Sequence, residues 1–199
     1  MTSPTSPKVK TPAVFDASAV VLVEGVSDRV ALETLAERRG RNLDAEGVSI
    51  VPIGGAQAIG NVLRLIRAQG REVRLAGLCD AGEERDFRRG LERAGLGSDL
   101  TRDTMEELGF YVCDADLEDE LIRSLGAAAV EAVLATHGDL ASFRTLQKQP
   151  QWQGRQKEEQ LRRYMGSGGS RKIKYARLLV DTLDLTRVPR PLDGVLAHV

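Results

Sequence analysis

Residues 19–28 read Ala-Val-Val-Leu-Val-Glu-Gly-Val-Ser-Asp, and this stretch decides the fold class. The unbroken apolar run Ala19–Val23 is typical of a strand that is buried on both faces of a sheet. Ser27 or Asp28 can cap the helix that we expect next, whose apolar side chains recur at helical spacing up to Arg38. A buried strand that leads through a short turn into a helix begins an alternating α/β fold.

The alternation of strand and helix continues along the chain. Strands are predicted at Val48–Ile53, Val73–Cys79 and Gly109–Cys113, helices between Ile59 and Gly70, at Glu83–Arg93 and at Leu117–Leu125, and a loop at Gly95–Arg102. This order predicts an α/β fold in which a mostly parallel sheet is flanked by helices on both faces.

The character of the sequence changes after Gly126. Helix-compatible segments follow at Ala127–Thr136, at residues 140–163 with a break at Pro150, and at Lys174–Leu183, while Gly166–Ser170 is predicted to be a mobile Gly/Ser loop. We therefore expect a disordered leader at residues 1–15, an α/β domain at 16–126 and a small helical C-terminal subdomain at 127–199.

Composition limits the classes of function. The formal net charge of −1 gives no overall basic field, although an acidic metal centre is able to offset a basic rim. Aromatic residues make up 4% of the chain, which argues against base stacking as a binding mode. Cys79 and Cys113 lie singly in apolar runs, which fits reduced thiols in the cytoplasm. No signal-peptide pattern is present and the apolar runs are too short to span a bilayer, so no membrane contact is expected.

Acidic residues follow three of the predicted strands. Glu24 comes directly after the first strand, Asp80 ends the third, and Asp116-Leu-Glu-Asp-Glu follows the fourth. The carboxyl ends of parallel strands line one edge of a sheet, so Glu24 and Asp80 converge if their strands are neighbours. Clustered carboxylates repel one another unless a cation neutralises them, and their oxygen ligands suit Mg²⁺ or Mn²⁺.

Some of these acids also have an ordinary structural explanation. Asp28 and Glu118 each lie near the start of a predicted helix, where capping and the helix dipole favour acidic residues. Glu24 is different, because a carboxylate at the end of a buried strand has no routine capping role.

The segment Val23-Glu24-Gly25-Val26-Ser27-Asp28 resembles the first motif of topoisomerase–primase (TOPRIM) domains, and the chain is similar to the subgroup found in OLD-family (overcoming lysogenization defect) nucleases. The resemblance covers about residues 18–125, with a weaker echo at Lys172–Leu183. It implies a TOPRIM-like fold, and it implies an enzyme that cleaves a phosphodiester bond of DNA with the help of two metal ions. In that subgroup the domain normally follows an ATPase, but this sequence contains no Walker-type loop.

The resemblance also assigns roles to individual residues. Glu24 would be a metal ligand or general base, Asp28 would support the second cation, and Asp80 would bridge the metals. Glu118, with Asp116 nearby, would complete the outer site. Lys172 would stabilise charge in the transition state, with Lys174 as the alternative.

The sequence departs from the family pattern at one position. TOPRIM domains carry Asp-x-Asp after the third strand, whereas this chain reads Asp80-Ala81-Gly82. Glu83 or Glu84 would have to supply the missing carboxylate from a different geometry, and Gly82 instead leaves room for a backbone to approach a phosphate.

Three readings of function remain open. The first is a metal-dependent nuclease acting on DNA, with any ATPase on a separate chain. The second is a degenerate, non-catalytic TOPRIM module that binds nucleic acid or a partner ATPase. The third is a plain doubly wound domain that binds a phosphorylated ligand or accepts phosphate on Asp80. Whether the C-terminal helices clamp DNA, form a homodimer or cover the sheet is also open.

Overall fold

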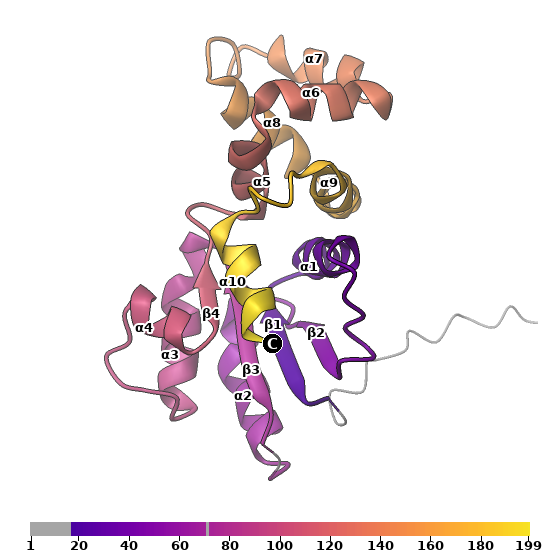
Figure 1. Cartoon of the computed structure of the whole chain (residues 1–199). Helices are drawn as coiled ribbons and strands as arrows, with labels where there is room; N and C mark the ends of the chain where they lie inside the picture. The colour runs from indigo at the N-terminus through magenta and orange to yellow at the C-terminus, as the bar shows by residue number, and fades with distance from the viewer. Residues whose placement is uncertain (1–16, 71) are drawn as a thin grey trace, which may run out of the picture.

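The computed structural model describes residues 17–70 and 72–199 (Figure 1). Its centre is a sheet of four parallel strands in the order β2-β1-β3-β4. The strands are β1 (Ala19–Val23), β2 (Val48–Pro52), β3 (Arg74–Cys79) and β4 (Phe110–Val112). The predicted α/β fold class is confirmed, whereas the predicted leader at residues 1–15 lies outside the described residues.

The strand register brings two of the acidic positions together. Val23, the last residue of β1, pairs with Leu78 of β3. Glu24 and Asp80 therefore leave adjacent strands at the same edge of the sheet, which we call the carboxyl edge. The proximity that the sequence analysis made conditional on neighbouring strands is confirmed.

The two faces of the sheet are covered by different helices. Val21 and Val23 of β1 pack with α1 (Val26–Arg38), whereas Val20 and Leu22 pack with helices from the opposite face. The opposite-face elements are η1 (Ala56–Ala58), α2 (Ile59–Arg67), η2 (Ala81–Glu83), α3 (Glu84–Arg93) and α4 (Arg102–Glu107). The prediction missed α4, a six-residue helix whose N-terminus is capped by the Thr101 side chain.

The C-terminal part of the chain forms six helices in the described residues, stacked beyond the carboxyl edge and back along the sheet (Figure 1). They are α5 (Leu117–Leu125), α6 (Ala127–Thr136), α7 (Leu140–Gln147), α8 (Lys157–Met165), α9 (Gly169–Thr182) and α10 (Arg190–His198). Phe143, Tyr164 and Tyr175 stack edge to face at centroid distances of 5.6 and 6.5 Å and join α7, α8 and α9.

Two of these helices pack against the α/β part. Helix α9 packs along α1, and α10 returns to pack against β3 and β4 (Figure 1). The Arg38 side chain of α1 donates hydrogen bonds of 2.7 Å to the carbonyl oxygens of Val180 and Leu183 at the end of α9. One apolar core runs from β1 through α9 to α10, so the helical part is packed against the α/β part.

The glycine-rich stretch before α9 differs from its prediction. We expected a mobile loop at Gly166–Ser170 and a helix from Lys174, but α9 already begins at Gly169. Gly168 has a φ of 102°, which L-residues with side chains rarely adopt and which turns the chain into the helix. Lys172 therefore lies in the first part of a helix.

Two further observations concern the chain as a whole. The thiols of Cys79 and Cys113 are buried and unpaired, as predicted from their apolar surroundings. Within residues 17–70 and 72–199, no helix combines the length and the apolar composition needed to cross a bilayer.

Candidate metal centre

The carboxyl ends of β1 and β3 hold the first pair of acids. The backbone N–H of Asp80 donates a 2.7 Å hydrogen bond to Oε1 of Glu24. In the described residues, the Asp80 carboxylate itself has no hydrogen-bond or ion-pair partner. The hydrogen bond thus fixes the position of Glu24, whereas the Asp80 carboxylate forms neither a hydrogen bond nor an ion pair with a described residue.

Asp28 joins this pair from the first turn of α1. The helix begins at Val26 with Gly25 as its N-cap, so Asp28 is the third helical residue and not the cap that the sequence analysis allowed. Its Oδ2 accepts a 2.8 Å hydrogen bond from Gly25 N–H, and the residue is 9% exposed. One oxygen of Asp28 therefore has the structural role expected of an acid at a helix start.

Helix α5 contributes the remaining acids. Asp116 is its N-cap and accepts a 2.9 Å hydrogen bond from Asp119 N–H. Glu118 is 5% exposed and forms an ion pair with Lys172 at 3.3 Å. Glu120 is equally buried but accepts from Asp114 N–H at 2.8 Å, a separate contact from that of Glu118 with Lys172.

The two candidate lysines have different surroundings. Lys172 pairs with Glu118, whereas Lys174 pairs with Asp139 at 2.6 Å and lies over the ring of Tyr175. Burial lowers the pKa of Lys172, but the facing carboxylates, including Glu118 and Asp80, outweigh burial and raise it. Of the two, Lys172 is therefore the lysine that reaches the acidic centre.

The carboxylates at the carboxyl edge influence one another. Burial first, and then the negative charges of Glu24 and Asp28, raise the pKa of Asp80 to about 8. Burial also raises the pKa of Glu24 to about 7, against the effect of its hydrogen bond from Asp80. Burial and the charge of Glu118 raise the pKa of Asp28 to about 6. These carboxylates share one electrostatic environment in which a cation would be stabilising.

The outer acids already have cationic partners. The Arg162 side chain of α8 donates from Nε to Oδ2 of Asp116 at 2.7 Å, and Lys172 pairs with Glu118. In the part of the chain that the structure describes, no three Asp, Glu, His or Cys side chains are arranged to hold an ion by themselves. The donor set nevertheless has the oxygen chemistry of a divalent-cation site.

Gly82 stands at the position of the second Asp in the Asp-x-Asp motif. A Cβ built on Gly82 meets nothing within 4 Å, so a side chain there has room. Glu84 is held by Arg102 at 2.7 Å. The charge of Glu83 contributes to the raised pKa of Glu24, so Glu83 is the better candidate to replace the missing carboxylate.

Arg162 lies at the site but was not among the residues predicted from the sequence. It lies in a segment rich in charged and amide residues, Gln156–Arg163, and no spacing singles it out from Arg155 or Arg163. Only the packing of α8 against α5 brings its guanidinium to Asp116.

Comparison with known proteins agrees with this geometry. Residues 15–81 match the family model for the TOPRIM domain of overcoming lysogenization defect protein-like (OLD-like) proteins. This segment contains Glu24, Asp28 and Asp80. The chain therefore contains an OLD-like TOPRIM domain, and domains of this type typically bind divalent metal ions.

Solved structures extend the likeness to nearly the whole chain. The C-terminal region of the Burkholderia pseudomallei OLD protein has a TM-score of 0.68 at 19% identity and is covered to 97%, with 92% of this chain covered. The C-terminal region of the Xanthomonas campestris pv. campestris OLD protein has a TM-score of 0.71 at 22% identity, with 94% of this chain and 93% of that one covered. At these identities the likeness establishes a shared fold. A comparison with curated proteins gave no match.

Proposed function

We propose that this protein cleaves phosphodiester bonds in DNA with Mg²⁺ or Mn²⁺ as cofactor. The observation that supports the proposal is the convergence of Glu24, Asp28, Asp80 and Glu118 with Lys172 at the carboxyl edge of an OLD-like TOPRIM domain. When bound, divalent cations supply charge neutralisation and an activated water for attack on phosphorus.

The residues of the sheet would hold the cations and receive the proton. Asp80 would be a metal ligand, because its carboxylate is buried among acids and has no partner in the described residues. Glu24 would be a metal ligand or the general base that accepts a proton from the attacking water. The hydrogen bond from Asp80 N–H holds one Glu24 oxygen in place and leaves the other for this task.

The residues of the helical part, together with Asp28 of α1, would hold the second cation and the phosphate. Asp28, Asp116 and Glu118 would form the outer site. The ammonium of Lys172 would stabilise the charge that develops on the phosphate oxygens. Arg162, which pairs with Asp116, would offer a second cationic contact to the phosphate.

A second function is supported by one specific observation. Gly82 removes a carboxylate from the motif, and loss of a ligand weakens metal affinity. The alternative is a non-catalytic TOPRIM module that binds nucleic acid or a separate ATPase subunit.

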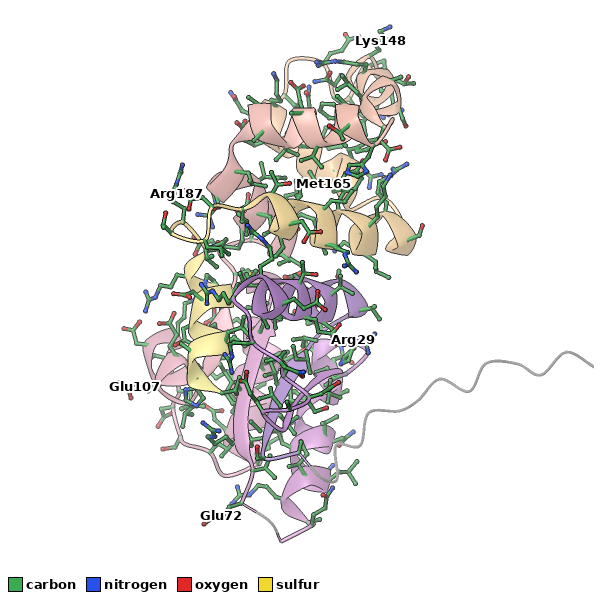
Figure 2. The ribbon with its side chains drawn as sticks, turned by 45° about the vertical axis from the view of Figure 1, so that its right-hand side comes forward. Arg29, Glu72, Glu107, Lys148, Met165 and Arg187 are labelled. Atoms are coloured by element: carbon green, nitrogen blue, oxygen red, sulfur yellow. The ribbon has the colours of Figure 1, made fainter. Side chains whose placement is uncertain are left out.

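A nicking assay on supercoiled plasmid separates these functions. Wild type is compared with Glu24→Gln and Asp80→Asn in Mg²⁺ and in Mn²⁺, and Glu107→Gln is the matched control, because Glu107 is an exposed acid on α4 (Figure 2). We expect cleavage by wild type and by the control only. Cleavage that survives both site substitutions would contradict the nuclease proposal. No cleavage by any protein, with metal-induced thermal stabilisation lost in both site variants, would favour the non-catalytic module.

A further inference from the structure

A basic groove lies between α2 and α3, on the face of the sheet opposite α1 and α10. Its volume is about 650 Å³, and the polar residues that line it are Gln57, Asn61, Arg64, Asp86, Arg89 and Arg93. None of these residues belongs to the metal centre. The groove therefore needs its own explanation.

The charge of the groove is positive. Arg64, Arg89 and Arg93 are exposed, and Asp86 is the only acid among the described residues of the lining. In the part of the chain that the structure describes, Arg89 and Arg93 form no ion pair. Arg85, Arg89 and Arg93 follow one another at intervals of four on α3, an arrangement in which like charges repel along one side of a helix. A polyanion bound along this side would relieve that repulsion.

The two helices approach each other through glycine. A Cβ on Gly90 would collide with Cγ2 of Ile59 and lie 3.1 Å from the backbone nitrogen of Gly60. The floor of the groove is therefore formed largely by backbone, and the arginines stand on both sides of it. Among the described residues, no aromatic side chain lines the groove, so it has no platform for stacking a base.

The groove begins near the metal centre. Helix α2 follows the carboxyl end of β2 through η1, and α3 starts four residues after Asp80. Both helices then run back along the sheet, side by side (Figure 1). A strand of nucleic acid that leaves the metal centre on this side would follow the groove from Gln57 and Asn61 towards Arg64 and Arg93.

We propose that the α2–α3 groove binds the phosphate backbone of the DNA on which the metal centre acts. This inference rests on the proposed function, because it names a second contact for the same substrate. Arginine contacts to phosphate position the nucleic acid and carry no sequence information. The groove would thus hold the DNA in register without selecting a sequence.

The test measures binding in EDTA, so that it does not depend on cleavage. The double variant Arg89→Gln/Arg93→Gln is compared with wild type and with Lys148→Gln/Arg155→Gln. The control removes the same charge from exposed residues at the far end of the helical part, where Figure 2 labels Lys148. Fluorescence anisotropy of a short labelled duplex, and of its single strand, is measured over a series of salt concentrations.

We expect the groove variant to bind at least one of the two DNA forms about tenfold more weakly at moderate salt. For each phosphate that the variant no longer neutralises, the slope of log K against log[salt] should fall in magnitude by about 0.9 on duplex DNA, or about 0.7 on a single strand. The control should keep the wild-type affinity and slope, and circular dichroism should show all three proteins folded.

Two results would overturn this proposal. One is DNA binding by the groove variant with the wild-type affinity and slope. The other is wild type that binds polyglutamate in this groove but does not bind DNA, which would assign the groove to an acidic protein partner. Tenfold weaker binding in EDTA by a protein whose wild type never cleaves would support the groove and contradict only the nuclease proposal.

Discussion

The acids on the sheet and the acids on α5 lie at the same edge but are stabilised differently. Asp80 ends a buried strand and its carboxylate has no cationic partner in the described residues. Asp116 and Glu118 are each paired with a cation from the helical part, Arg162 and Lys172. The sheet therefore carries a carboxyl group whose ionised form has no cationic partner, whereas the acids of the helical part are already balanced by cations. A divalent cation should therefore stabilise the protein mainly by neutralising the carboxylates at the end of the sheet strands.

Lys172→Gln should have the largest effect on activity. Loss of a group that stabilises transition-state charge typically costs about 10²–10³-fold in rate. Metal affinity should not fall, because Glu118 loses a competitor for its oxygens. Single-turnover cleavage and metal titration by calorimetry measure the two quantities.

The matched control for Lys172 is Lys174→Gln, which removes the same charge two residues away. It should lose thermal stability through its contact with Asp139 while keeping its cleavage rate. A larger rate loss in Lys174→Gln than in Lys172→Gln would reverse the assignment.

Asp80→Asn should weaken metal binding about 100-fold or more, since loss of even an outer-shell partner costs about 10–100-fold. Because burial and the neighbouring acids disfavour the ionised form of Asp80, the substitution should make the metal-free protein more stable. Asp116→Asn should instead destabilise the metal-free protein, because Asp116 caps α5 and pairs with Arg162. Melting temperatures in EDTA and in Mg²⁺ check both statements. Equal destabilisation by the two substitutions would end the distinction between the sheet acids and the helix acids.

Gly82→Asp should strengthen metal binding about tenfold, the lower end of what supporting groups contribute to metal affinity. The position has space for a side chain, so the substitution restores the Asp-x-Asp pattern without a clash. Gly82→Asn is the control, because it has the same shape without the charge. A gain in Gly82→Asn that equals the gain in Gly82→Asp would mean that charge at this position does not matter.

The smallest expected effect is on stability against pH. The pKa values of Asp80, Glu24 and Asp28 are raised to about 8, 7 and 6. At any pH between the ordinary pKa of such a carboxyl group and its raised pKa, the folded protein therefore binds more protons than the unfolded chain. Stability of the metal-free protein should therefore fall as pH rises from about 5 to about 8. A domain of this size loses about 2–4 °C in Tm per kcal/mol.

The pH effect also predicts how metal should act. Stabilisation by Mg²⁺ should grow over the same range, as the ion replaces the released protons. Melting curves of wild type and Asp80→Asn in EDTA measure the pH dependence, and the variant should give a flatter profile. If the metal-free wild type became more stable as the pH rises towards 8, the predicted pH dependence would be wrong.

Much of the fold could be predicted from local sequence. The five buried residues of β1, the strand ends at Glu24 and Asp80, and the positions of the helices after them follow from apolar runs and spacing. The start of α9 and the short helix α4 could not be predicted. The glycines before α9 favour a loop locally, and α4 is too short for a helical period to emerge.

By itself, the sequence determined that acids stand at the carboxyl ends of parallel strands, because chain direction and strand burial fix where a strand ends. It left the choice between Lys172 and Lys174 open and gave no sign of Arg162. Only the tertiary structure decided these points, since the packing of α8 and α9 against α5 determines which side chains reach the acids. Contacts between residues far apart in the chain depend on how helices pack, which no local spacing encodes.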